Sequence, residues 1–327
     1  MDRRKFIAGV ASGTVMGTAG CVGLFSDDTP EFEFEFNGPN EAVVDGNVTV
    51  TISAEAINAE GEEVEPPTVD VVHTGSSEVV ANNIFEEVEM VEGKEEIDVV
   101  VSVGNTAGED QFVLTMSGEE VGEYTVTLID DPAAQTAPIE QYEADIEFDT
   151  FSDEGDEIEW GYVEMGDHTA EEYYLEGEIR FAGDAIEFEE WYANGTMYRI
   201  SMLLDTRETT VEQQDEPNVL VTFSEYEALA ESESVTTLKD GTHEYVLTER
   251  DVDEETRLEI TQSDEFELAV VMESDGTPLE YELVESIDSD GFEDEVSVLE
   301  VDYRSVNEPV PMPDIPDELT TANGDNN

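Results

Sequence analysis

Apolar and polar residues alternate in short runs over residues 31–130. These runs are residues 32–36, 48–52, 69–72, 97–103, 112–116 and 124–129. A period of two places successive side chains on opposite faces of a strand, so the pattern predicts half-buried β-strands. Turn-forming dipeptides separate the runs: Asp45-Gly46, Glu60-Gly61, Glu92-Gly93 and Gly104-Asn105.

A second strand-rich stretch covers residues 139–316. It contains three dipeptide turn signals between alternating runs: Asn194-Gly195, Asp240-Gly241 and Asp275-Gly276. Both central residues of a type I′ turn need a positive φ, which these residue types tolerate. We therefore expect three hairpins with positive φ at both positions. Residues 224–231, with Ser224 as N-cap and Glu227 in a capping box, predict one helix packed on the sheet.

Prolines and small residues divide and close these stretches. Residues 131–138 hold two prolines and predict a linker, while Pro309, Pro311, Pro313 and Pro316 predict an extended close. We expect a mainly β chain: a β-sandwich over 31–130, a curved antiparallel half-barrel sheet with about one helix over 139–316, and a disordered tail over 317–327. The strand number and spacing of the sandwich resemble an immunoglobulin-like domain.

The N-terminus carries a different pattern. Arg3 and Arg4 precede Phe6 and an uncharged run of small and apolar residues that ends before Cys21. This order predicts an exported chain with a signal peptide over residues 1–20. The paired arginines resemble the twin-arginine export signal. Residues 18–21 resemble a lipobox, which implies that Cys21 is lipidated and starts the mature chain.

Cys21 is the only cysteine of the chain, so an incidental cysteine at this place is disfavoured. Residues 21–30 predict a polar tether. We expect the protein at the outer face of the cell membrane, held there by the lipid on Cys21. The alternatives are a plain signal peptide and an uncleaved anchor helix. The short, glycine-rich apolar run disfavours the helix.

The net charge of the chain predicts the salt concentration in which the protein folds. The net charge is −75, from 86 acidic and 11 basic residues, yet 39% of the residues are hydrophobic. Self-repulsion opposes a compact state in dilute buffer, whereas in molar salt the Debye length falls to about 3 Å. The composition therefore predicts a halophilic protein with a solvated acidic surface, similar to haloarchaeal lipoproteins. The scarcity of basic residues disfavours nucleic-acid binding.

Residues 191–198, Trp-Tyr-Ala-Asn-Gly-Thr-Met-Tyr, place aromatic residues on both sides of a hairpin turn. With the hairpin at residues 275–279 and the proline-rich close, they resemble the lipoprotein-carrier superfold of the LolA-like and LppX-like proteins. The resemblance covers residues 139–316. It implies an incomplete β-barrel whose concave face, covered by helices, accepts lipid tails. This sequence offers only one clear covering helix.

Aromatic residues of this stretch form the candidate ligand face. We expect them on the inner face of the curved sheet, where they either fill a core or hold a lipid or isoprenoid chain. The candidates are Trp160, Phe188, Trp191, Tyr192 and Tyr198.

Other candidate chemistry is sparse. His73, His168 and His243 lie far apart in polar surroundings, and the sequence has no Gly-x-Ser-x-Gly motif and no glycine-rich phosphate loop. We expect no catalytic site and no cofactor. Asp288 and Asp290 lie in a run similar to a calcium loop, but serines occupy its first and twelfth positions, which favours a solvated turn over a metal site.

Two further features concern the surface and the function. Asn47 and Asn194 begin Asn-x-Thr sequons and are candidate glycosylation sites on an exported chain. The favoured hypothesis is a lipid-anchored, non-catalytic surface protein that binds an apolar ligand in the half-barrel. The alternatives are a structural or adhesive envelope protein, with both domains as protein-interaction modules, and an enzyme with an unrecognised carboxylate site.

Overall fold

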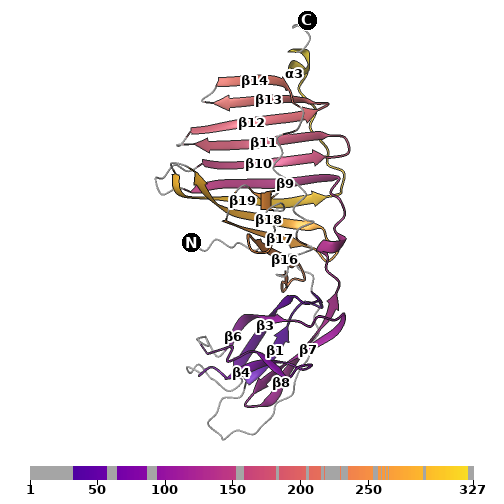
Figure 1. Ribbon diagram of the computed structural model, residues 1–327, viewed down its shortest axis with the longest axis vertical. Coiled ribbons are helices and arrows are strands. Elements are labelled where there is room, and N and C mark those ends of the chain that lie inside the picture. Colours follow the sequence, from indigo (N-terminus) through magenta and orange to yellow (C-terminus); the bar gives the residue numbers. More distant parts are fainter. Residues whose placement is uncertain are drawn as a thin grey trace. The chain divides into compact units, whose positions relative to one another are not determined.

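A computed structural model describes most of the chain after residue 31 (Figure 1). The described residues are 32–56, 65–86, 94–151, 158–181, 184–203, 206–214, 217, 229, 235–252, 257–258, 260–261, 263, 265–289 and 292–322. The described part of the chain is mainly β, with 65% of its residues in strands, which confirms the predicted fold class.

The chain divides into two compact units. Unit 1 consists of Met1–Asp131 and Glu233–Glu244, and unit 2 consists of Pro132–Ser232 and Tyr245–Asn327. The segment expected as a linker, residues 131–138, contains the short 3-10 helix η1 (Ala133–Gln135). Ala133 is buried, and its backbone N–H donates to the hydroxyl of Tyr245 at 3.3 Å. Residues 132–138 are therefore an ordered part of unit 2, whereas Asp131 belongs to unit 1.

Unit 1 contains two sheets. One has the strand order β2-β8-β7-β4-β5. Its strands are β2 (Glu41–Val43), β4 (Val69–His73), β5 (Glu78–Ala81), β7 (Gly108–Met116) and β8 (Glu119–Ile129). In the other, β3 (Asn47–Ala56) pairs with β1 (Phe32–Asn37), β6 (Lys94–Ser102) and β15 (Val235–Thr237).

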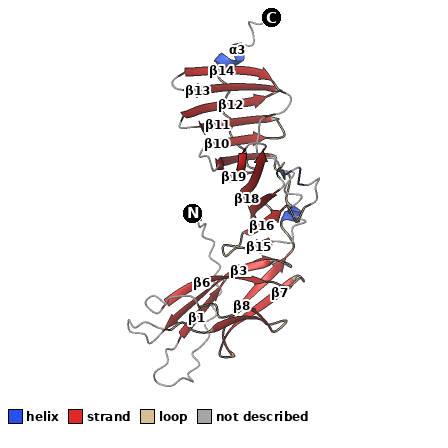
Figure 2. Cartoon of the chain, turned by 60° about the vertical axis from the view of Figure 1, so that its left-hand side comes forward, coloured by secondary structure: helices blue, strands red, loops and turns tan. Residues whose placement is uncertain are grey.

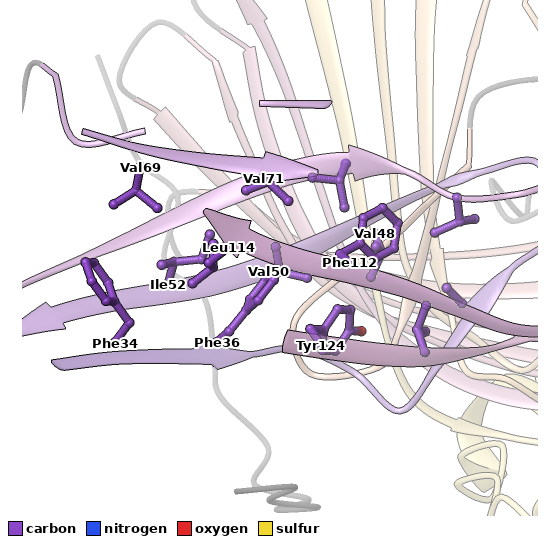
Figure 3. Packing of buried hydrophobic residues seen from close by; sticks show 14 of the residues in the cluster. Phe34, Phe36, Val48, Val50, Ile52, Val69, Val71, Phe112, Leu114 and Tyr124 are labelled. Carbon is purple, nitrogen blue, oxygen red and sulfur yellow. The ribbon is translucent and has the colours of Figure 1, made fainter. Parts of the chain in front are cut away.

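The core of unit 1 lies between these two sheets (Figure 3). Every second residue of β3 faces it, so Val48, Val50 and Ile52 are fully buried, opposite Phe112 and Leu114 of β7. Burying each such side chain contributes about 1.5–3 kcal/mol. The predicted alternation thus corresponds to a two-sheet packing. Its finer assignment as immunoglobulin-like stays a prediction.

β15 belongs to unit 1 because it pairs with β3. β6 pairs with residues 47–55 of β3 along one edge of that strand. Along the other edge, β1 pairs with residues 51–56 of β3, and β15 pairs in parallel with residues 47–48. The Thr237 hydroxyl also accepts a hydrogen bond from the backbone N–H of Val43 at 3.3 Å. No sequence pattern indicated this return, because β15 is three residues long.

Unit 2 is built on one antiparallel sheet (Figure 2). Its strand order is β17-β18-β19-β9-β10-β11-β12-β13-β14, and β16 (His243–Thr248) follows β17 at the other end. The strands are β9 (Gln141–Phe151), β10 (Ile158–Asp167), β11 (Glu172–Phe181), β12 (Asp184–Ala193), β13 (Thr196–Leu203), β14 (Thr206–Gln213), β17 (Glu265–Met272), β18 (Pro278–Ser289) and β19 (Phe292–Val306).

The three predicted hairpin turns differ from one another. Asn194 and Gly195 have φ values of 51° and 70°, as a type I′ turn requires. At the other two turns only the glycines, Gly241 and Gly276, have positive φ. The expectation for Asp240 and Asp275 was therefore wrong. Each of these loops begins one residue earlier than expected. The backbone N–H of Leu238 donates to the carbonyl of Thr242, and that of Glu273 donates to the carbonyl of Thr277. In these longer loops only the glycine adopts the left-handed conformation.

The expectation of a disordered tail over residues 317–327 is wrong for residues 317–322, while residues 323–327 lie outside the described part of the chain. Residues 308–316 have no regular secondary structure, and α3 (Asp317–Ala322) follows them. Leu319 is 2% exposed, because together with Met312 and Ile315 it packs against apolar side chains of the sheet. The predicted helix at residues 224–231 lies outside the described residues, except for Leu229, which is helical and buried.

Candidate ligand-binding face of unit 2

The register of the unit 2 sheet assigns each side chain to a face. Directly paired residues of antiparallel strands point to the same face, and neighbours in one strand point to opposite faces. Trp160 of β10 pairs with Phe148 of β9 and with Ile179 of β11. Ile179 pairs with Ile186, and Ile186 with Leu203. We call Phe148, Trp160, Ile179, Ile186 and Leu203 the apolar row, and the face that carries it the apolar face.

The apolar row is only partly covered. Phe148, Trp160, Ile179 and Ile186 are half-buried, and Leu203 is 41% exposed. The Nε1 atom of Trp160 is buried and has no hydrogen-bond partner among the described residues. A buried indole N–H normally finds an acceptor. The row therefore offers apolar surface together with one unused hydrogen-bond donor.

A second row lies beside the first on the same face. It consists of Ile146, Tyr162, Gly177, Phe188 and Ser201. A Cβ atom at Gly177 would overlap the carbonyl oxygen of Gly161 and the backbone of Tyr162. The glycine allows β10 and β11 to approach closely here. Tyr162 is consequently buried, and its ring lies near that of Phe188, with 6.0 Å between the ring centroids.

A third row contains three charged residues and consists of Ala144, Glu164, Leu175, Glu190 and Arg199. Glu164 and Glu190 are buried on a face that is otherwise mostly apolar. Glu164 accepts a hydrogen bond from the hydroxyl of Tyr142. Arg199 forms a salt bridge with Glu190, and its Nε atom donates to Oε2 at 2.6 Å. A buried carboxylate needs such partners to stay ionised.

These carboxylates change the acidity of their neighbours. Burial raises the pKa of the Tyr162 hydroxyl, and the negative charges of Glu164 and Glu190 raise it further. Burial raises the pKa of Tyr142 as well, followed by the charge of Glu164 and its hydrogen bond. Both phenols remain protonated near neutral pH.

The far end of the apolar face is filled by its own side chains. Tyr142, Tyr173, Tyr192 and Met197 are all buried there. The hydroxyl of Tyr173 lies 2.7 Å from Nδ1 of His168. Burial lowers the pKa of His168, and the charge of Asp167 partly offsets that effect. The open part of this face is consequently the end that carries the apolar row.

The five predicted ligand-face residues divide between the two faces. Trp160, Phe188 and Tyr192 lie on the apolar face, whereas Trp191 and Tyr198 pair with each other on the opposite face. The expectation of one shared face was wrong for these two, because Trp191 and Tyr192 are neighbours in one strand. Trp191 packs with Tyr174, Ile200 and Leu319 beneath the C-terminal segment. The alternation inside β12 was the signal that separates them.

The remaining predicted site residues have these positions. Asn194 is exposed in its hairpin turn, and Asn47 is half-buried in β3, where its amide oxygen accepts from Ser102 at 2.9 Å. Arg3, Arg4, Phe6, Cys21 and Asp290 lie outside the described residues, as does the side chain of Asp288. The described part of the chain has no metal-binding group of His, Cys, Asp and Glu. It also has no helix long and apolar enough to cross a bilayer.

One cluster in unit 1 was not anticipated from the sequence. His73 Nε2 lies 2.5 Å from Asp110 Oδ1, and His73 Nδ1 lies 3.0 Å from the hydroxyl of Ser76. The order Ser76, His73, Asp110 resembles a catalytic triad, but these contacts stabilise a turn. Nδ1 also accepts the backbone N–H of Ser76, and Asp110 accepts that of Gly104 at 2.7 Å. The cluster therefore connects the β4–β5 hairpin to the start of β7.

Comparisons with known proteins add little to this geometry. No family model matches the chain, and no curated protein matches it. Among solved structures, the chain is similar to a LolA superfamily protein from Nitrosomonas europaea. The identity is 12%, the match covers 57% of this chain and 92% of that chain, and the TM-score is 0.20. A TM-score this low says nothing about the function of this chain.

Proposed function

We propose that the protein is a non-catalytic, lipid-anchored surface protein of a halophile, and that unit 2 binds a lipid-like apolar ligand on its apolar row. One observation carries the ligand proposal: five large apolar side chains from five strands form a continuous, half-open row. Contiguous exposed apolar surface on a water-soluble domain indicates an interaction site. Concentrated salt increases the free energy gained when such apolar surface is buried.

The anchor is supported by the N-terminal pattern, in which Cys21 follows a signal peptide. Replacing Cys21 by Ser removes the thiol that carries the lipid. We expect the Cys21→Ser protein to leave the membrane fraction, or to retain its signal peptide, when cells are fractionated in high salt. Unchanged membrane retention of a processed Cys21→Ser chain would contradict a thioether anchor.

The ligand proposal is tested by native mass spectrometry with lipid extraction. The sample is the full mature chain in molar salt, because β15 lies in unit 1 and a fragment of residues 139–316 would cut across both units. We expect a stoichiometric, extractable apolar ligand. Leu203→Asn should reduce its occupancy, because Leu203 is the most exposed end of the row. Met202→Asn, on the opposite face, is the matched control and should leave occupancy unchanged.

A second candidate function is a structural or adhesive envelope protein. It is favoured by the filled end of the apolar face, where Tyr142, Tyr173 and Met197 are all buried. A ligand-free mass in the extraction experiment, with no binding of an apolar dye, would support this second function. That result would reject the ligand proposal.

A further inference from the structure

Arg199 is the one basic residue in the three rows of the apolar face. Its guanidinium has five N–H donors, of which those on Nε and Nη2 bind Glu190 Oε2. No other partner of Arg199 is recorded among the described residues. Its side chain is 41% exposed, whereas that of Glu190 is 3% exposed. Arg199 therefore presents unused donors at the open side of a buried ion pair.

The surroundings of Arg199 have no surplus of positive charge. The buried Glu190 compensates the guanidinium, and the buried Glu164 lies in the same row, three strands away from Arg199. Glu208 and Glu212 of β14 lie diagonally next to Arg199 on the same face. An anionic group that approached the free donors would be repelled chiefly by Glu190, because molar salt screens the exposed Glu208 and Glu212 but screens a buried charge much less. Like charges that face each other across a binding site cost several kcal/mol.

Apolar and polar surfaces follow one another along β13. Arg199, Ser201 and Leu203 are alternate residues of this strand, so they point to the same face. Four residues of a strand span about 13 Å. A ligand with a polar end at Arg199 therefore reaches the apolar row only if a chain of about that length follows its polar group. From there the row continues across β12, β11, β10 and β9.

We propose that Arg199 binds the uncharged, oxygen-bearing end of an amphipathic ligand, such as an ester, ether or alcohol oxygen, while the hydrocarbon chain lies on the apolar row. Glu190 excludes carboxylate and phosphate ends by compensating the charge of Arg199. Trp160, at the other part of the row, offers a second neutral donor. This inference rests on the proposed apolar-ligand function and adds the class of ligand that the site selects.

The test compares three probes that share a chain: hexadecane, methyl palmitate and palmitate. Each displaces a bound apolar dye from the full mature chain in molar KCl at pH 8, where palmitate is ionised. We expect methyl palmitate to bind at least about tenfold more tightly than palmitate. Glu190→Gln should remove most of this difference by strengthening palmitate binding. Glu189→Gln, the neighbour on the opposite face, is the matched control and should preserve it.

Two outcomes separate the inference from the function on which it rests. If hexadecane and the other probes fail to bind, the apolar-ligand function is wrong. If hexadecane binds, but the wild-type chain binds palmitate as tightly as methyl palmitate, only the inference is overturned. Arg199→Gln gives an independent test in case Glu190→Gln does not fold. This substitution should weaken the binding of methyl palmitate and leave the binding of hexadecane unchanged. Equal weakening of binding for both probes would contradict a polar contact with Arg199.

Discussion

At the scale of single residues, burial sets what His243 does. His243 is fully buried in unit 1, and its Nδ1 atom lies 3.0 Å from the hydroxyl of Thr237. Burial lowers its pKa to about 4, although the charges of Asp131 and Asp240 act in the opposite direction. The imidazole is therefore neutral in the folded protein. It takes part in the hydrogen bonding that places β15 on the edge of β3.

This burial predicts a pH dependence of stability. An unfolded histidine has a pKa of about 6.5, so between that pH and about pH 4 the unfolded state binds more protons than the folded state. His243 should therefore destabilise the fold as the pH falls from 6.5 to 4, by on the order of 3 kcal/mol. Urea unfolding in high salt at several pH values measures this loss.

The control for the His243 prediction is His243→Gln, which keeps a polar side chain but does not titrate. Carboxylates change protonation in both proteins, so the difference between the two curves isolates the imidazole. We expect the difference in unfolding free energy between the wild-type and His243→Gln proteins to become smaller as the pH is lowered. Parallel curves from pH 7 to pH 4 would show that His243 has an ordinary pKa.

At the scale of elements, side-chain packing holds the C-terminal segment on the sheet. Leu319 of α3 is buried with Trp191 and Tyr174, whereas the Glu318–Arg207 ion pair beside it is solvent-exposed. A six-residue helix is not stable by itself. Packing of Leu319, Met312 and Ile315 therefore explains why this tail is ordered, and composition alone predicted the opposite.

Leu319→Ala tests that explanation. Removing a buried leucine side chain costs about 2–5 kcal/mol when the surroundings cannot close the cavity. We expect α3 to detach, with faster amide exchange in residues 308–322 and a red shift of Trp191 fluorescence. Glu318→Gln, which removes only the exposed ion pair, should cost less than about 1 kcal/mol. A Glu318→Gln effect equal to that of Leu319→Ala would indicate that charge holds the segment.

At the scale of the whole molecule, the charge of −75 predicts that the chain folds only in concentrated salt. The face of unit 2 opposite the apolar row shows the effect locally. Glu300 of β19 pairs directly with Glu147 and with Glu282. Burial raises the pKa of Glu300, and the charges of Glu282 and Glu147 add to that shift. Like charges directly opposite each other destabilise a sheet, and only salt or protonation relieves them.

We therefore expect the thermal unfolding midpoint to rise steeply with KCl concentration, and the β signal in far-ultraviolet circular dichroism to be lost on dilution into low salt. Screening is the physical cause, because the Debye length shrinks from about 10 Å at 0.1 M to about 3 Å at 1 M. Sucrose at equal osmolality is the control, since it favours the compact state without screening. Equal stabilisation by sucrose would refute the electrostatic explanation.

The sequence by itself determined the features that depend on neighbouring residues. Alternation over residues 32–36 and 48–52 predicted strands β1 and β3, and Asn194-Gly195 predicted a type I′ turn, because strand faces and turn dihedral angles are local properties. Strand alternation also held the information that Trp191 and Tyr192 point apart. The prediction of a concentrated-salt solvent also rests on the net charge alone, and it stays a prediction.

Tertiary structure alone decided which distant residues meet. The register across five strands aligns Phe148 with Leu203 in one row, whereas the pairing of Glu190 with Arg199 already follows from the two-residue turn at Asn194-Gly195. The return of β15 to β3 and the burial of Leu319 are decided in the same way. Each depends on a surface supplied by residues far away in the chain, so its free energy exists only once that surface has formed.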